Sequence, residues 1–123
     1  MKKILLVEDG KHLSQIYKEE LEELGYSVDL EATGNAALKY LETGTPDLII
    51  LDINLPDING IMVLQQIKNA HLEIPIMMCT AYEQFESYYQ RFTDKNREYY
   101  SYLIKPITLE KLQTEVEKAI GKP

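Results

Sequence analysis

Three short runs of apolar residues divide the chain, and each has the length of a β-strand. They are Ile4–Val7, Leu48–Leu51 and Ile74–Cys79. Nearly every position in these runs is apolar, which is typical of strands that are covered on both faces. The segment 27–32 instead alternates apolar and charged residues, which predicts a half-exposed strand at the edge of a sheet. A fifth strand is expected at 101–104.

Between these runs, apolar residues recur three and four positions apart, which predicts amphipathic helices. This spacing is carried by Leu13, Ile16, Tyr17, Leu21 and Leu24, by Leu64 and Ile67, and by Leu109, Leu112, Val116 and Ile120. A weaker helix is expected at Asn35–Glu42, while Gly25 should end the first helix and Thr108 should cap the last. Alternating strands and helices favour an α/β fold, a parallel sheet with helices on both faces.

Length, composition and charge narrow the class of protein. A chain of 123 residues with 45% hydrophobic residues can bury one core, so we expect a single domain over 1–123 without an output domain. The formal charge of −7 disfavours direct binding to nucleic acid or to anionic membranes. The first apolar run is too short for a signal peptide or a membrane span, and the lone Cys79 fits a reduced, cytoplasmic setting.

Polar residues stand where the predicted strands end. Glu8-Asp9 follows the first run, Asp52 the second and Thr80 the third, and Lys105-Pro106 follows the last strand. Because ligands of open α/β sheets bind at the carboxyl ends of the strands, we expect three carboxylates, one hydroxyl and one ammonium group in one cleft. Each residue alone could be an ordinary solvated or helix-capping residue, but chance does not place all five at strand ends.

The chemistry of this cluster points to phosphoryl transfer. Neighbouring carboxylates repel one another, and either a hard divalent cation or protonation at a raised pKa relieves the repulsion. Mg²⁺ is the better candidate, since it binds one or two carboxylates and leaves room for water and phosphate oxygens. One carboxylate is then free to attack phosphorus and form an aspartyl-phosphate. Lys105 would neutralise the added charge, and Thr80 would donate a hydrogen bond to a phosphoryl oxygen.

From end to end, the chain resembles a response-regulator receiver domain of two-component signalling, similar to the chemotaxis regulators. The matching residues are Glu8-Asp9, Asp52, Asn54, Pro56, Gly60, Thr80-Ala81, Tyr102 and Lys105-Pro106. Each residue is weak support alone, but the ordered set is highly specific. The resemblance implies a flavodoxin-like, doubly wound sheet of five strands in the order 2-1-3-4-5, with five helices. It also implies a signalling switch rather than an enzyme.

The resemblance further implies how the site is used. Asp52 would accept a phosphoryl group from a histidine kinase or a histidine phosphotransfer protein. Mg²⁺ would be held by Asp9, Asp52 and the main-chain carbonyl of Asn54, with Glu8 contributing through water. No other cofactor is implied.

The resemblance also assigns a conformational switch. Thr80 and Tyr102 would be the switch pair, with the hydroxyl drawn toward the phosphate and the ring turning inward behind it. The Lys105–Pro106 bond would be cis, and phosphorylation could drive dimerisation.

The segment 82–100 departs from the usual family pattern, because aromatic residues replace the expected small ones. Phe85, Tyr88, Tyr89 and Phe92 have helical spacing, which favours a helix packing its aromatic face on the sheet. A surface for a binding partner is the alternative. Tyr82, two residues after Thr80, should lie at the rim of the cleft or turn toward Phe85.

Three other functions compete with this interpretation. A flavin-binding protein of the same topology needs a glycine- and hydroxyl-rich phosphate loop after the first strand, and Glu8-Asp9 would repel that phosphate. An aspartate-based phosphohydrolase usually has an acid two residues after its nucleophile, where this chain has Asn54. A scaffold that works without phosphorylation has no need of the complete site.

Overall fold

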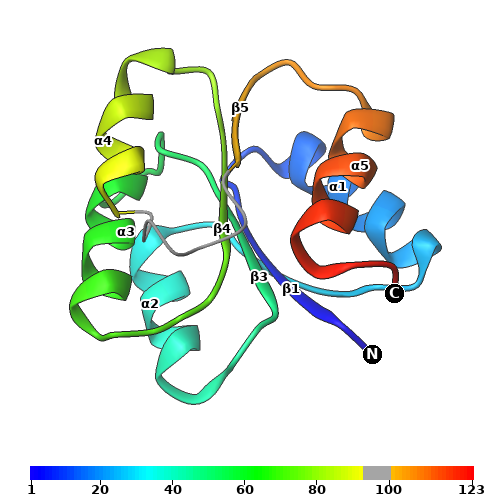
Figure 1. The fold of residues 1–123 in the computed structure, drawn as a ribbon, viewed down its shortest axis with the longest axis horizontal. Coiled ribbons are helices and arrows are strands. Elements are labelled where there is room, and N and C mark those ends of the chain that lie inside the picture. The colour runs from blue at the N-terminus through cyan, green and yellow to red at the C-terminus, as the bar shows by residue number, and fades with distance from the viewer. Residues whose placement is uncertain (93–100) are drawn as a thin grey trace.

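A five-stranded parallel sheet forms the central layer of the protein, and helices cover both of its faces (Figure 1). The structure is a computed structural model, and it describes residues 1–92 and 101–123. The strands are β1 (Lys3–Val7), β2 (Ser27–Glu31), β3 (Leu48–Leu51), β4 (Ile76–Thr80) and β5 (Ser101–Ile104). Their order is β2-β1-β3-β4-β5, which confirms the predicted fold class and topology.

Five α-helices and one short 3₁₀ turn are found in the described residues. They are α1 (Lys11–Leu24), α2 (Gly34–Thr43), α3 (Gly60–Asn69), the 3₁₀ turn η1 (Glu83–Phe85), α4 (Glu86–Phe92) and α5 (Leu109–Ile120). The predicted signals act at their ends: Gly25 closes α1 in the left-handed conformation, and Thr108 accepts a hydrogen bond from the N–H of Lys111. Within these residues, none of the helices has the length and apolar character needed to cross a membrane.

Alternation along the strands divides the core into two layers. Leu5, Ile49 and Met78 point toward the face covered by α2, α3 and α4. Their neighbours Leu6, Ile50 and Met77 point toward the face covered by α1 and α5. Because side chains of a strand alternate between faces, a continuous apolar run fills both layers.

Some predicted boundaries were wrong by one or two residues. β4 begins at Ile76 rather than Ile74, and β2 ends at Glu31, so Ala32 lies outside the edge strand. The aromatic segment starts with the tight turn η1, which contains Phe85, and only then becomes α-helical. The side chains of Tyr88 and Phe92, and all of 93–100, lie outside the described residues.

A buried carboxylate ties α5 to the edge of the sheet. Glu115 accepts a hydrogen bond from the Ser101 hydroxyl at 3.0 Å, and its side chain is only 8% exposed. Lys111 and Lys118 lie 3.4 and 3.2 Å from its second oxygen. Burial alone would raise the pKa of Glu115, but these partners together hold it below its usual value.

The two ends of the chain meet at the amino-terminal edge of the sheet. Lys2 Nζ donates hydrogen bonds to the carbonyls of Ile120 at 2.5 Å and Lys122 at 2.7 Å. The Tyr26 hydroxyl donates to the carbonyl of Gly121 at 2.7 Å. These contacts attach the segment after α5 to β1 and to the start of β2.

Candidate functional site

The carboxyl ends of β1 and β3 bring three acidic residues together, as the sequence predicted. Carboxylate oxygens of Glu8, Asp9 and Asp52 lie within 4.8 Å of one another. We call these three residues the acidic cluster. Glu8 and Asp52 are buried, at 5% and 7% exposure, whereas Asp9 is exposed to solvent. The cluster therefore has a buried inner part and an open outer rim.

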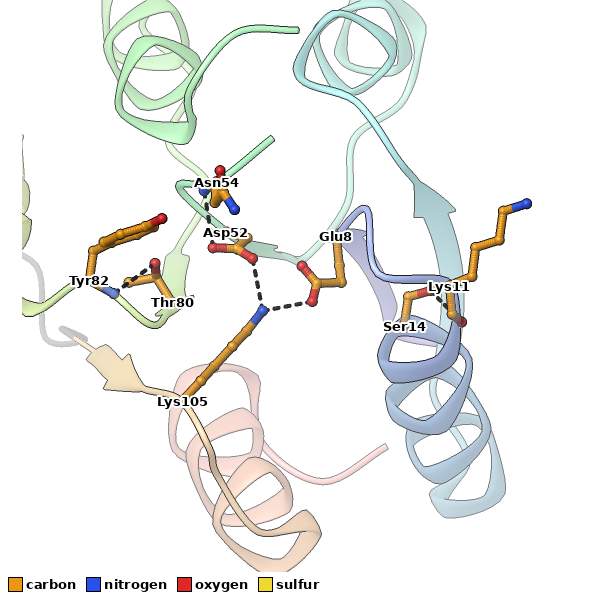
Figure 2. Close-up of polar contacts among 8 residues, drawn as sticks. All are labelled: Glu8, Lys11, Ser14, Asp52, Asn54, Thr80, Tyr82 and Lys105. Carbon is orange, nitrogen blue, oxygen red and sulfur yellow. Dashed lines mark hydrogen bonds and ion pairs between the residues drawn. The ribbon is translucent and has the colours of Figure 1, made fainter. Parts of the chain in front are cut away.

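Lys105, which follows β5, reaches across the sheet into the acidic cluster (Figure 2). Its Nζ atom lies 2.6 Å from Glu8 Oε1 and 2.8 Å from Asp52 Oδ2. The peptide bond between Lys105 and Pro106 is cis, as the resemblance implied. The lysine thus pairs with two buried carboxylates at once, and the pairing with Glu8 was not predicted from the sequence.

The buried groups shift one another's acidity. Burial raises the pKa of Glu8 to about 7, the neighbouring Asp52 adds to this effect, and Lys105 opposes it. Burial also disfavours ionised Asp52, but its contacts with Glu8 and Lys105 outweigh burial and hold the pKa of Asp52 below its usual value. The pKa of Lys105 is raised above its ordinary value because the attraction of both carboxylates exceeds the cost of its burial. Asp52 is therefore anionic at neutral pH, whereas Glu8 takes up a proton more readily than an ordinary glutamate does.

The loop after β3 supports Asp52 through contacts of its main chain. The N–H of Asn54 donates to Asp52 Oδ1 at 3.2 Å, and the N–H of Gly60 donates to the carbonyl of Ile53 at 2.8 Å. Gly60 lies so close to β3 that a Cβ atom there would be 2.1 Å from the main-chain oxygen of Asp52. The loop can therefore close tightly only with glycine at this position.

Thr80, Tyr82 and Tyr102 lie on the β4 side of Asp52. Thr80 is fully buried, and its Oγ1 accepts a hydrogen bond from the N–H of Tyr82 at 3.3 Å. Tyr102 is 9% exposed, and its hydroxyl donates to the carbonyl of Tyr82. The ring of Tyr102 packs on that of Tyr89, with centroids 5.8 Å apart. The Tyr102 ring is thus already turned inward in this structure.

Tyr82 lies at the rim of the site. Its ring is on the side of the site where Thr80 and Asn54 lie (Figure 2), and the residue is 38% exposed. It also meets the ring of Phe85 edge to face, with centroids 6.5 Å apart. The sequence left two positions open for Tyr82, at the rim of the cleft or turned toward Phe85. In the structure the ring does both.

The aromatic residues of α4 were predicted to face the sheet. Tyr89 fulfils this, because it is buried on Tyr102 and its hydroxyl donates to the carbonyl of Ile76.

Cys79 is buried as predicted, and burial raises the pKa of its thiol to about 12. At neutral pH the reactive thiolate form of Cys79 is therefore scarce.

The donor set fits a hard divalent cation. The cluster offers only oxygen atoms, which Mg²⁺ and Ca²⁺ prefer. Glu8 Oε2 is buried and has no hydrogen-bond partner among the described residues, so this oxygen is available to a water or an ion. Asp9 and Asn54 are exposed, which leaves the outer side of the cluster open to water and to an incoming phosphate.

Comparison with known proteins decides the family. The sequence profile described as the response regulator receiver domain matches residues 4–117. The chain belongs to the response-regulator receiver family. Receiver domains are parts of signalling proteins, not classical enzymes, and they are phosphorylated by histidine kinases.

Curated relatives of this receiver domain are transcriptional and luminescence regulators. It is 32% identical to the luminescence regulatory protein LuxO of Vibrio campbellii over 117 residues, which are 95% of this chain and 25% of LuxO. It is 34% identical to the response regulator ArlR of Staphylococcus saprophyticus over 122 residues, which are 99% of this chain and 54% of ArlR. The chain thus spans only a quarter to a half of the length of these relatives.

Solved receiver structures have the same fold. The response regulator TrrA of Thermotoga maritima, crystallised in complex with Mg²⁺-BeF, is 34% identical, with a TM-score of 0.84 over 97% of this chain and 99% of TrrA. The receiver domain of a LuxO repressor from Vibrio parahaemolyticus is 29% identical, with a TM-score of 0.86 over 97% of this chain and 89% of that one.

Proposed function

We propose that this receiver domain is a phosphorylation-dependent signalling switch whose phosphoacceptor is Asp52. The observation that carries the proposal is the position of Asp52: a buried carboxylate, paired with Lys105 at 2.8 Å, within an acidic cluster that is open on one side. We infer that the whole chain, 1–123, acts as one receiver domain in the cytoplasm. The phosphoryl group comes from a histidine kinase or a histidine phosphotransfer protein.

Mg²⁺ is the cofactor of the proposed reaction. Asp9, Asp52 and the main-chain carbonyl of Asn54 hold the ion, and Glu8 contributes through water. The availability of Glu8 Oε2 and the exposure of Asp9 support this assignment. When bound, the ion supplies positive charge that neutralises the acidic cluster and the phosphoryl oxygens. The Mg²⁺-BeF complex of TrrA is a precedent for such chemistry in a related protein.

The protein's own residues carry the transfer. An oxygen of Asp52 forms a bond to phosphorus while the bond between phosphorus and the donor's histidine nitrogen breaks, and the released imidazole takes up a proton. Lys105 then neutralises the aspartyl-phosphate, and Thr80 donates a hydrogen bond to a phosphoryl oxygen. Hydrolysis adds water to the phosphorus and returns the Asp52 carboxylate and inorganic phosphate.

The switch acts through Thr80 and Tyr102. In this proposal, movement of the Thr80 hydroxyl toward the phosphate breaks its hydrogen bond with the N–H of Tyr82. That change alters the β4–η1 turn, whose Tyr82 carbonyl accepts the hydrogen bond of Tyr102. The presence or absence of the phosphoryl group would then determine whether the Tyr102 ring keeps its inward position. Dimerisation on phosphorylation is one output that such a change could produce.

Phosphorylation by a small-molecule phosphodonor tests the assignment. Labelling should need Mg²⁺, should map to Asp52 and should be lost in the Asp52→Asn variant. Asp47→Asn is a suitable control, because Asp47 is an exposed carboxylate before β3 and should not affect labelling. Stoichiometric labelling of Asp52→Asn at a site other than Glu8 or Asp9 would contradict the proposal. A scaffold that works without phosphorylation remains the second candidate, and it predicts no labelling of the wild type.

A further inference from the structure

The loop that follows Asp52 is held from outside by the first turn of α2. Asp57 Oδ1 accepts a hydrogen bond from the N–H of Gly34 at 2.8 Å, and Oδ2 accepts one from the N–H of Asn35 at 2.8 Å. The N–H groups in the first turn of a helix have no partner within the helix, so an outside acceptor satisfies them. A single carboxylate thus joins the β3–α3 loop to an element more than 20 residues earlier in the chain.

A second contact joins the same two segments. Ile58 lies against Gly34, where a Cβ atom would be only 2.5 Å from Ile58 Cγ1. Glycine at this position therefore lets the loop come close to α2. Because Asp57 and Ile58 are adjacent in the chain, their two contacts form one attachment point between the loop and α2.

Two further main-chain hydrogen bonds of the loop converge on Ile53. The N–H of Leu55 and that of Gly60 both donate to the carbonyl of Ile53, at 3.0 and 2.8 Å. Pro56 and Asn54 are exposed. The N–H of Asn54 also donates to Asp52 Oδ1. The main chain at Asn54 is consequently held by Asp52 and Ile53 on one side and by the attachment point on α2 on the other.

We propose that Asp57 is a positioning residue for the metal site. Its two hydrogen bonds hold the loop on α2 and thereby fix the direction of the main-chain carbonyl of Asn54. The inference rests on the proposed function, in which this carbonyl is a ligand of Mg²⁺. Groups that hold metal ligands in place typically change metal affinity 10- to 100-fold when they are removed. Asp57 is exposed, so salt largely screens the direct effect of its charge on the ion.

Mg²⁺ titration of purified variants tests the proposal without any activity measurement. Isothermal titration calorimetry at about 0.15 M salt would compare wild type, Asp57→Ala, Asp57→Asn and Thr33→Ala. Thr33 is the matched control. It is the N-cap of α2, and its hydroxyl accepts a hydrogen bond from the N–H of Ala36 in the same first turn without contacting the β3–α3 loop through that bond. Both alanine variants weaken the start of α2, yet only Asp57→Ala removes the hydrogen bonds between the loop and α2.

The expected result is a loss of Mg²⁺ affinity of about 10-fold in Asp57→Ala and about 3-fold in Asp57→Asn, which keeps one acceptor oxygen. Thr33→Ala should bind as the wild type does. Should Asp57→Ala fail to fold, the comparison of Asp57→Asn with Thr33→Ala decides the matter.

Three outcomes overturn the positioning role. They are wild-type affinity in Asp57→Ala, an equal loss in Thr33→Ala, and equal losses in the Ala and Asn variants, which would indicate an effect of charge alone. In each case a wild type that binds Mg²⁺ leaves the proposed function standing. A wild type that binds no Mg²⁺ overturns the proposed magnesium site, and this inference with it.

Discussion

Replacement of Gly60 by alanine should damage the site without removing any of its functional groups. A Cβ atom at this position would lie 2.1 Å from the carbonyl oxygen of Asp52 and 2.8 Å from both Asp52 C and Ile53 Cα. Cβ atoms essentially never come within 3.0 Å of a heavy atom in another part of the chain. All three neighbours are main-chain atoms of the loop that follows β3, so no flexible side chain can move aside. Either α3 or the Asp52 peptide must shift by roughly 1 Å.

The size of the effect follows from this displacement. Overpacking a close contact costs about 1–3 kcal/mol, and a clash with backbone belongs at the upper end. Alanine regains up to about 1 kcal/mol of helix propensity over glycine, so a net loss of about 2 kcal/mol is expected. A misplacement of about 1 Å at a reacting group can slow a reaction about 100-fold. Phosphorylation should therefore suffer more than stability.

Urea unfolding followed by circular dichroism would give the change in stability, and Mg²⁺-dependent labelling by a phosphodonor would give the rate. Gly10→Ala is the matched control, because its Cβ atom would lie 3.5 Å from Glu8 Oε1, an ordinary contact. Its φ of −70° also suits any residue. That variant should stay within about 0.5 kcal/mol of the wild type. Wild-type stability and labelling in Gly60→Ala would refute the reasoning about this close approach.

Three further substitutions test separate features. Asp9→Ala should weaken Mg²⁺ binding and phosphorylation together, and an unchanged affinity in a titration would remove Asp9 from the ligand set. Tyr82→Ala should speed dephosphorylation several-fold, a barrier change of about 1 kcal/mol, because the ring limits the approach of water to phosphorus; an equal or slower rate would count against shielding. Glu115→Gln should cost about 1 kcal/mol at pH 7, since Lys111 and Lys118 lose their partner. The pKa of Glu115 is lowered by folding, so this loss should be full above its unfolded value of 4.5 and should vanish as the pH falls through the lower folded value. A pH-independent loss would show that packing rather than charge is responsible.

The sequence predicted most of the fold because its signals are local. Apolar runs of strand length mark β1, β3 and β4, and the caps at Gly25 and Thr108 lie within one turn of the helices they close. The position of Asp52 at the end of a buried strand could likewise be predicted, because the end of an apolar run is visible in the local sequence and does not depend on distant contacts. Parallel topology then placed the carboxyl ends of the strands at one edge.

The features that escaped prediction join distant residues. Lys105 and Glu8 are 97 positions apart and Asp57 and Gly34 are 23 apart, and no periodicity encodes such a pairing. The 3₁₀ turn before α4 was missed for a different reason. Spacing of Phe85 and Tyr89 fits an α-helix, but it does not reveal that the first of them belongs to a tighter turn.

The attachment of the C-terminal segment to Lys2 and Tyr26 makes this fold suitable for circular permutation. Both ends of the chain sit at the amino-terminal edge of β1, whereas Glu8 follows the opposite end, about 16 Å away along five strand residues. A linker of a few residues would join Pro123 to Met1 without disturbing the hydrogen bonds of Lys2 and Tyr26. New ends could then be opened in an exposed loop. Dyes or surface tethers attached at Met1 or Pro123 would stay clear of Asp52, so the phosphorylation of a tethered molecule could be followed without obstructing the acidic cluster.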